Sequence, residues 1–281
     1  MWANFHTHSL FCDGVGVFED YIQSAGQDMV SLGFSSHAPV PFDCKWCMKA
    51  GDFERYIDEL ETVQKSQRKI QIYKGLEADY VPGLVSPHTY QDRLDFTVGS
   101  IHFVDQLPNG RHWEIDNTHE VFLEGFSKIF KNNIRETIQR YYELTREMVS
   151  KFTPSIVGHL DKIKIQNKED KFFRESDSWY QDEINKTLGV IAKTGAIVEV
   201  NTRGLYQKKS TTPYPSPWII EKILEKRIPI TISSDAHHPK DIVNYFKGTA
   251  QQLIQIGFKH IHILKDGKWR PVQLTPNGIT T

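Results

Sequence analysis

Histidine and carboxylate side chains occur at two places in a spacing suited to holding a metal ion. His6 and His8 are separated by one residue near the N-terminus, and Asp235 and His237 by one residue near the C-terminus. On an extended segment, residues two positions apart point to the same side, so each pair could grip one cation. Imidazole with carboxylate favours Zn²⁺, Fe²⁺ or Mn²⁺, whereas Mg²⁺ and Ca²⁺ favour oxygen ligands. The spacing therefore predicts transition-metal chemistry.

Further residues of the same types follow other short apolar runs and bring the candidate ligands to nine. They are His6, His8, Asp13, His37, Glu77, His102, His159, Asp235 and His237. One zinc site uses about three or four protein ligands, so nine residues are too many for a single ion. A bridging carboxylate would let the set hold three ions, with water in the remaining positions. We therefore predict a polynuclear metal centre.

Each candidate also has an ordinary structural explanation. A single histidine at a strand end is commonly a hydrogen-bonded structural residue, Glu77 could form an ion pair, and Asp13 could be a turn residue. To explain the whole set in this way, several unrelated structural roles would have to fall by chance at neighbouring strand ends. We therefore favour metal binding. The histidines outside these strand ends are expected to be surface or packing residues. They are His88, His112, His119, His260 and His262.

The elements that position these side chains are short β-rich runs that alternate with amphipathic stretches, a pattern typical of βαβ units around a parallel sheet. The predicted strands are Trp2–Phe5, Val30–Ser36, Ile70–Leu76, Phe96–Ile101, Ser155–Gly158, Ala196–Val200 and Ile228–Ser233. Seven such units fit one α/β barrel better than two domains, so we predict a single domain over residues 1–281. In a parallel barrel the carboxyl ends of all strands lie on one face, where barrel enzymes build their active sites.

Helical spacing of apolar residues predicts the intervening helices. We expect a helix at Phe53–Ser66 capped by Asp52, one continuous helical stretch from Thr118 to Tyr141, a helix around Ile184–Ile191 that ends before Gly195, and one at Trp218–Lys226 opened by Ser216 and Pro217. A hairpin is expected at His260–Leu264 and Arg270–Leu274, because Asp266-Gly267 between them is a turn signal.

Composition limits the classes of partner. Lys and Arg number 34 and Asp and Glu number 35, for a formal charge of −1. This balance argues against a nucleic-acid surface or a polybasic membrane anchor, both of which need a basic excess. The N-terminus lacks the pattern of a signal peptide, and no run approaches the roughly 18 apolar residues of a membrane span. We expect a soluble, cytoplasmic protein.

The cysteines carry no predicted chemistry. The chain has three, too few and too irregular for a disulfide framework. Cys44 and Cys47 form a C-x-x-C spacing, but neither further zinc ligands nor a thioredoxin-like context accompanies it. We therefore expect loop cysteines without a redox or metal role.

The chain resembles the PHP superfamily (polymerase and histidinol phosphatase) in motifs that run in order from Asn4 to His237. The motifs are Phe5-His6-Thr7-His8-Ser9, Asp13-Gly14, Ser36-His37-Ala38-Pro39, Gly75-Leu76-Glu77, Gly99-Ser100-Ile101-His102, Gly158-His159 and Ser234-Asp235-Ala236-His237. More narrowly, Gly158-His159-Leu160-Asp161-Lys162 and Glu199-Val200-Asn201-Thr202-Arg203 resemble the stand-alone histidinol-phosphate phosphatases. Cys12 stands where members often carry serine, and the loop Pro39–Lys49 matches no family motif.

The resemblance implies a distorted (β/α)₇ TIM-like barrel and hydrolysis of L-histidinol phosphate to L-histidinol and phosphate, a step of histidine biosynthesis. It also implies three divalent ions, which could be zinc, iron or manganese. The family pattern would place one ion on His6, His8, Glu77 and Asp235, a second on Glu77, His102 and His159, and a third on Asp13, His37 and His237.

For such a reaction we expect metal-activated hydroxide to attack phosphorus. Arg203 would bind the phosphate and stabilise charge in the transition state, and Lys162 is a second candidate contact. An ion pair for Arg203 and a solvated Lys162 are the ordinary alternatives. Asp235 or His237 could protonate the leaving group, and the sequence does not separate that role from ligation.

Two other functions remain open. The same metals could serve another PHP phosphoesterase, either a phosphodiesterase or a protein-tyrosine phosphatase. The chain could also be a non-catalytic metal-binding module. The expected partner is a small phosphate monoester, with no nucleic acid and no membrane. Four residues in the loops after the second and fourth strands are plausible contacts for its organic part: Trp46, Trp113, Glu114 and Asp116.

Overall fold

The computed structural model describes residues 1–67 and 69–280. Seven parallel strands form the central sheet in the order β1-β2-β3-β4-β7-β8-β9. Their bounds are β1 (Trp2–Asn4), β2 (Met29–Phe34), β3 (Gln71–Asp79), β4 (Phe96–Ser100), β7 (Ile156–Val157), β8 (Ile197–Asn201) and β9 (Ile230–Ser233). Each strand falls on a run that the sequence predicts as β structure.

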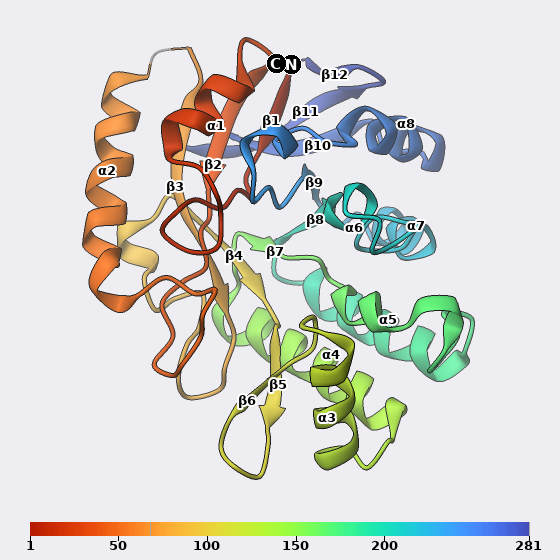
Figure 1. The fold of residues 1–281 in the computed structure, drawn as a ribbon. Helices are drawn as coiled ribbons and strands as arrows, with labels where there is room; N and C mark the ends of the chain where they lie inside the picture. Colours follow the sequence, from red (N-terminus) through yellow and green to blue (C-terminus); the bar gives the residue numbers. More distant parts are fainter. Residues whose placement is uncertain (68, 281) are drawn as a thin grey trace.

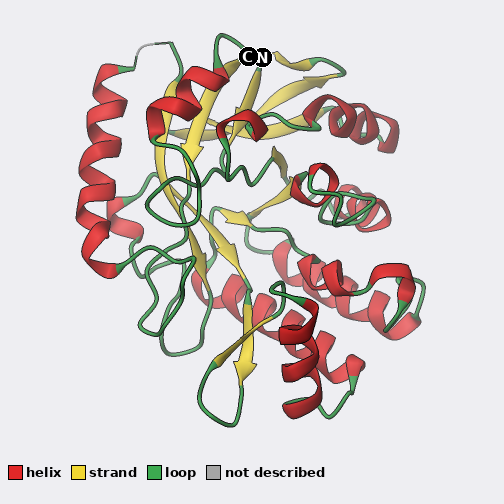
Figure 2. Cartoon of the chain, in the orientation of Figure 1, coloured by secondary structure: helices red, strands yellow, loops and turns green. Residues whose placement is uncertain are grey.

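The sheet curls until its two edge strands meet. Beyond the end of β1, the amide of His8 donates to Ala236 O at 2.8 Å, and the amide of Ala236 donates to His6 O at 3.1 Å. A parallel bridge between Thr7 and Ala236 completes this contact. The helices lie outside the strands (Figure 1 and Figure 2). The predicted distorted (β/α)₇ barrel is confirmed.

The helices are α1 (Phe18–Ala25), α2 (Phe53–Ser66), α3 (His119–Lys128), α4 (Ile134–Phe152), α5 (Ser178–Ile191), α6 (Arg203–Tyr206), α7 (Pro217–Glu225) and α8 (Phe246–Ile256). The predicted helices at α2, α5 and α7 are confirmed. Asp52 precedes α2, but its side chain makes no cap hydrogen bond and lies 3.3 Å from Arg55 instead. No helix in residues 1–67 or 69–280 combines the length and the apolar character needed to cross a membrane.

The prediction of one continuous helix after Thr118 is wrong, because the chain breaks between α3 and α4. Lys131 and Asn132 adopt left-handed conformations, with φ of 49° and 63°. The Asn133 side chain then accepts the amide of Glu136 at 3.2 Å and caps α4. Apolar spacing continues across the break, but these local capping interactions end one helix and start the next.

Two connections differ from the predicted strand–helix alternation. A hairpin of β5 (Phe103–Gln106) and β6 (His112–Glu114) follows β4 and was not predicted. Its turn contains Gly110 with φ of 82°, so Asn109-Gly110 was the sequence signal for it. Between β3 and β4 the described residues contain only a short 3₁₀ turn, Gln91–Arg93, instead of an α-helix.

The predicted C-terminal hairpin is confirmed as β10 (His260–Lys265) and β11 (Lys268–Thr275), to which β12 (Gly278–Thr280) adds a third strand. This sheet lies at the N-terminal ends of the barrel strands, where the amide of Ile279 donates to Met1 O at 2.9 Å. The Trp269 ring also packs on Phe5 at 4.9 Å. One end of the barrel is thereby covered, and the opposite end holds the candidate ligands.

Candidate metal centre

The structure brings all nine predicted ligands together at the carboxyl ends of the barrel strands. His6 and His8 follow β1, His37 follows β2, Glu77 lies in β3, His102 follows β4, His159 follows β7, and Asp235 and His237 follow β9. Asp13 reaches the group from the segment between β1 and α1. Most of these side chains are buried, whereas Asp13 is 33% and His237 15% exposed. The set is therefore mostly enclosed, with its more open side at Asp13 and His237.

Glu77 lies at the centre of this set. Its Oε2 atom is 3.0 Å from His6 Nε2, 3.4 Å from His8 Nε2 and 3.1 Å from His37 Nδ1. Its Oε1 atom is 2.9 Å from His159 Nε2 and 3.8 Å from His102 Nε2. One carboxylate thus faces five imidazoles, which is the arrangement expected of a bridging ligand.

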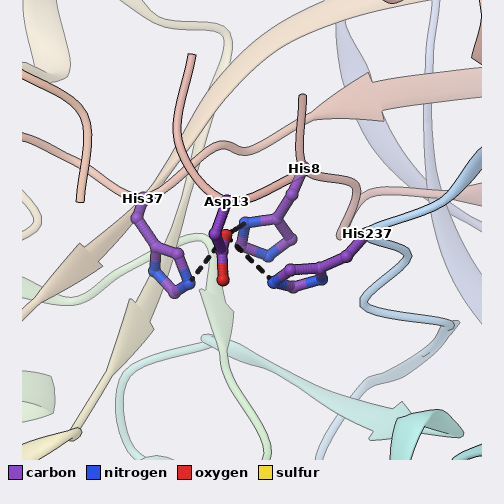
Figure 3. Close-up of side chains that lie close together, drawn as sticks. All are labelled: His8, Asp13, His37 and His237. Atoms are coloured by element: carbon purple, nitrogen blue, oxygen red, sulfur yellow. Dashed lines mark ion pairs between the residues drawn. The ribbon is translucent and has the colours of Figure 1, made fainter. Parts of the chain in front are cut away.

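Asp13 is the centre of a second group, shown in Figure 3. Its Oδ1 atom lies 3.1 Å from His237 Nε2, 3.7 Å from His8 Nδ1 and 3.8 Å from His37 Nε2. His8 and His37 therefore face Glu77 through one ring nitrogen and Asp13 through the other. These two rings connect the two groups into a single cluster.

The nitrogens of the cluster fit a metal better than they fit hydrogen bonds. His6 Nε2, His8 Nε2 and His37 Nδ1 are buried and form no hydrogen bond within the described residues. Buried polar atoms in proteins are nearly always bonded, so these nitrogens need a further partner. Groups with the spacing of a metal site are His8, Asp13, His37 and His237; His6, His8 and Asp235; His6, Glu77 and His159; and His37, Glu77 and His102.

These groups reproduce part of the division that the family resemblance implied. His6, His8 and Asp235 fall together, as do Asp13, His37 and His237. His102 and His159 were expected to share an ion, but they fall into separate groups, each with Glu77. Glu77 is common to both, so its bridging position agrees with the expectation.

The geometry after β9 differs from the predicted extended pair. Asp235 adopts a left-handed conformation with φ of 51°, which is costly for a residue with a side chain. The Tyr206 hydroxyl donates to Asp235 O at 3.0 Å, and Arg203 Nη1 donates to the same oxygen at 2.7 Å. This turn sends Asp235 toward His6 and His8, whereas His237 faces Asp13.

Contacts between the carboxylates and imidazoles of the cluster shift their pKa values and so set their charges. Burial by itself would raise the pKa of Glu77, but His6, His37 and His102 hold that pKa well below its usual value. Burial would lower the pKa of His8, but Cys12 and Asp235 raise it to about 9. The pKa of His102 is also raised to about 9, because Asp79 and Asp116 outweigh burial. Without metal, the carboxylates are ionised and several imidazoles hold protons.

Two buried carboxylates orient the cluster and had no predicted role. Glu199 Oε2 lies 2.8 Å from His6 Nδ1, and its Oε1 accepts the amide of His159 at 2.6 Å. Asp79 Oδ1 lies 2.9 Å from His102 Nδ1. Partners of this kind fix ring orientation in metal sites. The sequence contained a sign of each role. Asp79 is two residues after Glu77 and so shares its strand face, and Glu199 is a charged residue within an otherwise apolar predicted strand.

A pocket of about 190 Å³ opens over the cluster. His37, His102, Asp235 and His237 lie in its wall, together with both predicted phosphate contacts, Arg203 and Lys162. Lys209 also lines the pocket and was not predicted. Burial and the charges of Arg203 and Lys162 lower the pKa of Lys209. The pocket therefore combines the metal-ligand cluster with three cationic side chains.

Both predicted phosphate contacts, Arg203 and Lys162, lie beside a carboxylate. Arg203, the first residue of α6, contacts His237 Nδ1 and lies 3.5 Å from Asp235 Oδ1. Lys162 begins a 3₁₀ turn after β7, and its Nζ is 3.1 Å from Asp116 Oδ2. Asp116 raises the pKa of Lys162 against the effect of burial. Lys162 is thus a buried, paired cation, not a solvated one.

The loop after β2 differs from expectation. Cys44 and Cys47 form a disulfide, so the prediction of loop cysteines without a redox or metal role is wrong in their redox state. Their C-x-x-C spacing brings the sulfurs together even though the loop has no thioredoxin-like context. Trp46, inside the disulfide loop, lines the pocket with Glu114 and Asp116. Trp113 does not, because its ring is buried and its Nε1 donates to Val121 O at 2.9 Å.

Two curated relatives align with most of the chain. A protein of Deinococcus radiodurans named "Probable histidinol-phosphatase" is 27% identical over 261 residues, which cover 90% of this chain and 92% of the relative. The histidinol-phosphatase of Bacillus subtilis is 26% identical over 258 residues, or 84% of this chain and 94% of the relative.

A solved structure shares the fold. The histidinol phosphate phosphatase of Lactococcus lactis, a complex with zinc, L-histidinol and phosphate, aligns over 100% of this chain and 99% of that chain, with a TM-score of 0.65 and 17% identity. The sequence pattern of the PHP domain matches residues 4–203, which excludes Asp235 and His237. That match spans well over half of the 281 residues, so the chain belongs to the PHP domain family.

Proposed function

We propose that this protein hydrolyses L-histidinol phosphate to L-histidinol and phosphate at a metal centre built from the nine clustered side chains. The observation that carries the proposal is the convergence of those ligands with Arg203 and Lys162 on one pocket. The names of the two relatives and the ligands of the Lactococcus lactis structure support the choice of substrate. Because Asp235 and His237 complete the cluster that His6 begins, we also propose that residues 1–281 act as one domain.

We propose three divalent transition-metal ions, zinc, iron or manganese. His6, His8 and Asp235 would hold one, and Asp13, His37 and His237 another. Glu77 would join these to a third ion near His102 and His159. Metal ions in such a centre supply hydroxide near neutral pH by lowering the pKa of bound water.

The cationic residues of the pocket would bind and orient the phosphate. The Arg203 guanidinium is planar and can donate two parallel hydrogen bonds to phosphate oxygens. Its contacts with Asp235 and His237 place it beside the cluster before substrate arrives. Lys162 would offer a second charge from the side of His102, whose Nε2 lies 3.4 Å from Lys162 Nζ. As the alternative to binding metal, Asp235 or His237 would carry a proton from the attacking water to the leaving oxygen.

The test is a steady-state comparison of three substrates with the protein loaded with Mn²⁺ or Zn²⁺. L-histidinol phosphate should be hydrolysed with a much higher kcat/KM than phosphotyrosine or a dinucleotide. Activity confined to phosphotyrosine would indicate a protein-tyrosine phosphatase, and activity confined to the dinucleotide would indicate a phosphodiesterase. Either result would overturn the proposed substrate.

Replacing Glu199 by Gln should weaken metal binding by roughly 10- to 100-fold, because the His6 ring loses its orienting carboxylate. Competition with a chromophoric chelator measures this affinity. Glu183→Gln is the matched control, since Glu183 is equally buried but pairs with Arg146 on the outer helices. An unchanged affinity in Glu199→Gln would show that Glu199 is only structural.

Metal binding should release protons. The metal-free pKa values of His8 and His102 are raised to about 9, so both rings are protonated at pH 7, yet a metal needs the neutral nitrogen. Metal affinity should therefore increase as the pH rises from 7 toward 9. Calorimetry in buffers of different ionisation enthalpy measures the released protons. A binding heat that does not depend on the buffer would contradict this account.

A further inference from the structure

One wall of the pocket is built by residues that the proposed chemistry does not use. Arg203 contacts Asp235 and His237, whereas Trp46 packs against the ligands on the other strands. The Trp46 ring centroid is 4.4 Å from that of His37 and 5.4 Å from that of His102. Glu114, at the end of β6, lines the same pocket. This aromatic and acidic wall lies beside the metal ligands without belonging to them.

Trp46 is held firmly in this position. Its ring stacks on Phe103 with a centroid distance of 5.3 Å and an interplanar angle of 9°. Its Nε1 donates to Glu114 Oε2 at 3.2 Å. The disulfide between Cys44 and Cys47 closes the loop around it. A large aromatic side chain fixed at three points and left partly exposed in a pocket is preorganised to bind a ligand.

Glu114 offers a negative charge to this wall. Its Oε2 atom accepts hydrogen bonds from Trp46 and, at 2.6 Å, from Asn117 Nδ2, both neutral donors. Within residues 1–67 and 69–280, no basic side chain forms an ion pair with Glu114, whereas the neighbouring Asp116 pairs with Lys162. Glu114 is thus the carboxylate in this wall whose charge remains for a ligand.

The substrate of the proposed function matches this wall. L-histidinol phosphate carries an ammonium group on the carbon next to its ester carbon, and an imidazole at the end remote from its phosphate. A carboxylate favours the cationic nitrogen, and an aromatic ring favours both a cation and a flat heterocycle. We propose that Glu114 and Trp46 form the subsite for the amine and imidazole of the leaving group, and thereby select cationic phosphate esters over uncharged ones. This inference rests on the proposed function.

The decisive variant is Glu114→Gln, which keeps the shape and the acceptor for Trp46 but removes the charge. The measured quantity is the ratio of kcat/KM for L-histidinol phosphate to that for 4-nitrophenyl phosphate, whose leaving group has no cation. This ratio should fall about tenfold, chiefly through KM, as expected for loss of one charged contact. Trp46→Ala should lower it similarly, and Trp46→Phe should restore part of it.

Asp105→Asn is the matched control, because Asp105 is an exposed carboxylate on β5 of the same hairpin and lies outside this pocket. In Asp105→Asn, the ratio of kcat/KM for L-histidinol phosphate to that for 4-nitrophenyl phosphate should equal the ratio of the original protein. Calorimetric titration with L-histidinol gives a second readout, in which Glu114→Gln should weaken binding about tenfold. Metal content and Tm show whether each variant is folded, and if Trp46→Ala is not, Glu114→Gln decides alone.

The two proposals fail in different ways. If the original protein does not hydrolyse L-histidinol phosphate, the proposed function is wrong. If it does, but Glu114→Gln leaves the substrate ratio and L-histidinol binding unchanged, or lowers activity on both substrates equally, the subsite is wrong and the proposed function stands.

Discussion

Replacing His6 and His8 together by alanine should remove metal from the protein and lower kcat/KM on L-histidinol phosphate by about 10³-fold or more. Both rings face Glu77 and Asp235, so the double variant removes both imidazoles from the group that they form with Asp235. Metal activation of water contributes several kcal/mol to catalysis, and 1.36 kcal/mol corresponds to a tenfold change in rate. Elemental analysis of the purified variant and steady-state kinetics measure the two effects.

A matched double variant is available in His260→Ala with His262→Ala. These histidines have the same spacing, but they lie on β10 at the other end of the barrel. This control should keep both its metal and its activity. Full metal retention in the His6 and His8 double variant would remove these residues from the ligand set.

Replacing Arg203 by alanine should lower kcat/KM by about 10²- to 10³-fold, the usual cost of losing one preorganised donor to developing charge. Arg203 lines the pocket and already lies against Asp235 and His237. Inhibition by inorganic phosphate should weaken in parallel, because the same side chain would bind the product. Arg203→Lys should recover only part of the loss, since lysine cannot donate two parallel bonds.

Arg135→Ala serves as the control for Arg203, because Arg135 is an exposed arginine of α4 outside the pocket. Its kinetics should match those of the original protein. Metal content must also be compared, since Arg203 contacts His237. Unchanged kinetics in Arg203→Ala would exclude it from phosphate binding, and a loss of activity that follows a loss of metal would make it a positioning residue.

The barrel and the ligand cluster were predictable because both depend on local patterns. The run Phe96–Ile101 is rich in apolar and β-branched residues, as expected of a strand covered on both faces, and the polar residue His102 marks where the run ends. Parallel strands then bring their carboxyl ends to one face without further information. For this reason His6, Glu77 and His159 meet although they are far apart in the sequence.

The remaining features depend on tertiary contacts that no local pattern contains. Asp235 has a left-handed backbone, and Tyr206 and Arg203 donate hydrogen bonds to its carbonyl oxygen. Neither feature is visible in the spacing of Asp235 and His237. From their positions in predicted loops, Trp46 and Trp113 were equally plausible substrate contacts. The tertiary structure distinguishes them, since Trp46 lines the pocket and Trp113 is buried against α3.

We propose that one cluster of nine side chains holds several metal ions beside a phosphate-binding arginine. Anomalous diffraction from a crystal of the metal-loaded protein, collected on both sides of the absorption edge, tests it most directly. We expect three anomalous peaks at the carboxyl ends of the strands, around Glu77 and Asp13 and within coordination distance of the clustered histidines. A single peak, or peaks away from these residues, would contradict the account.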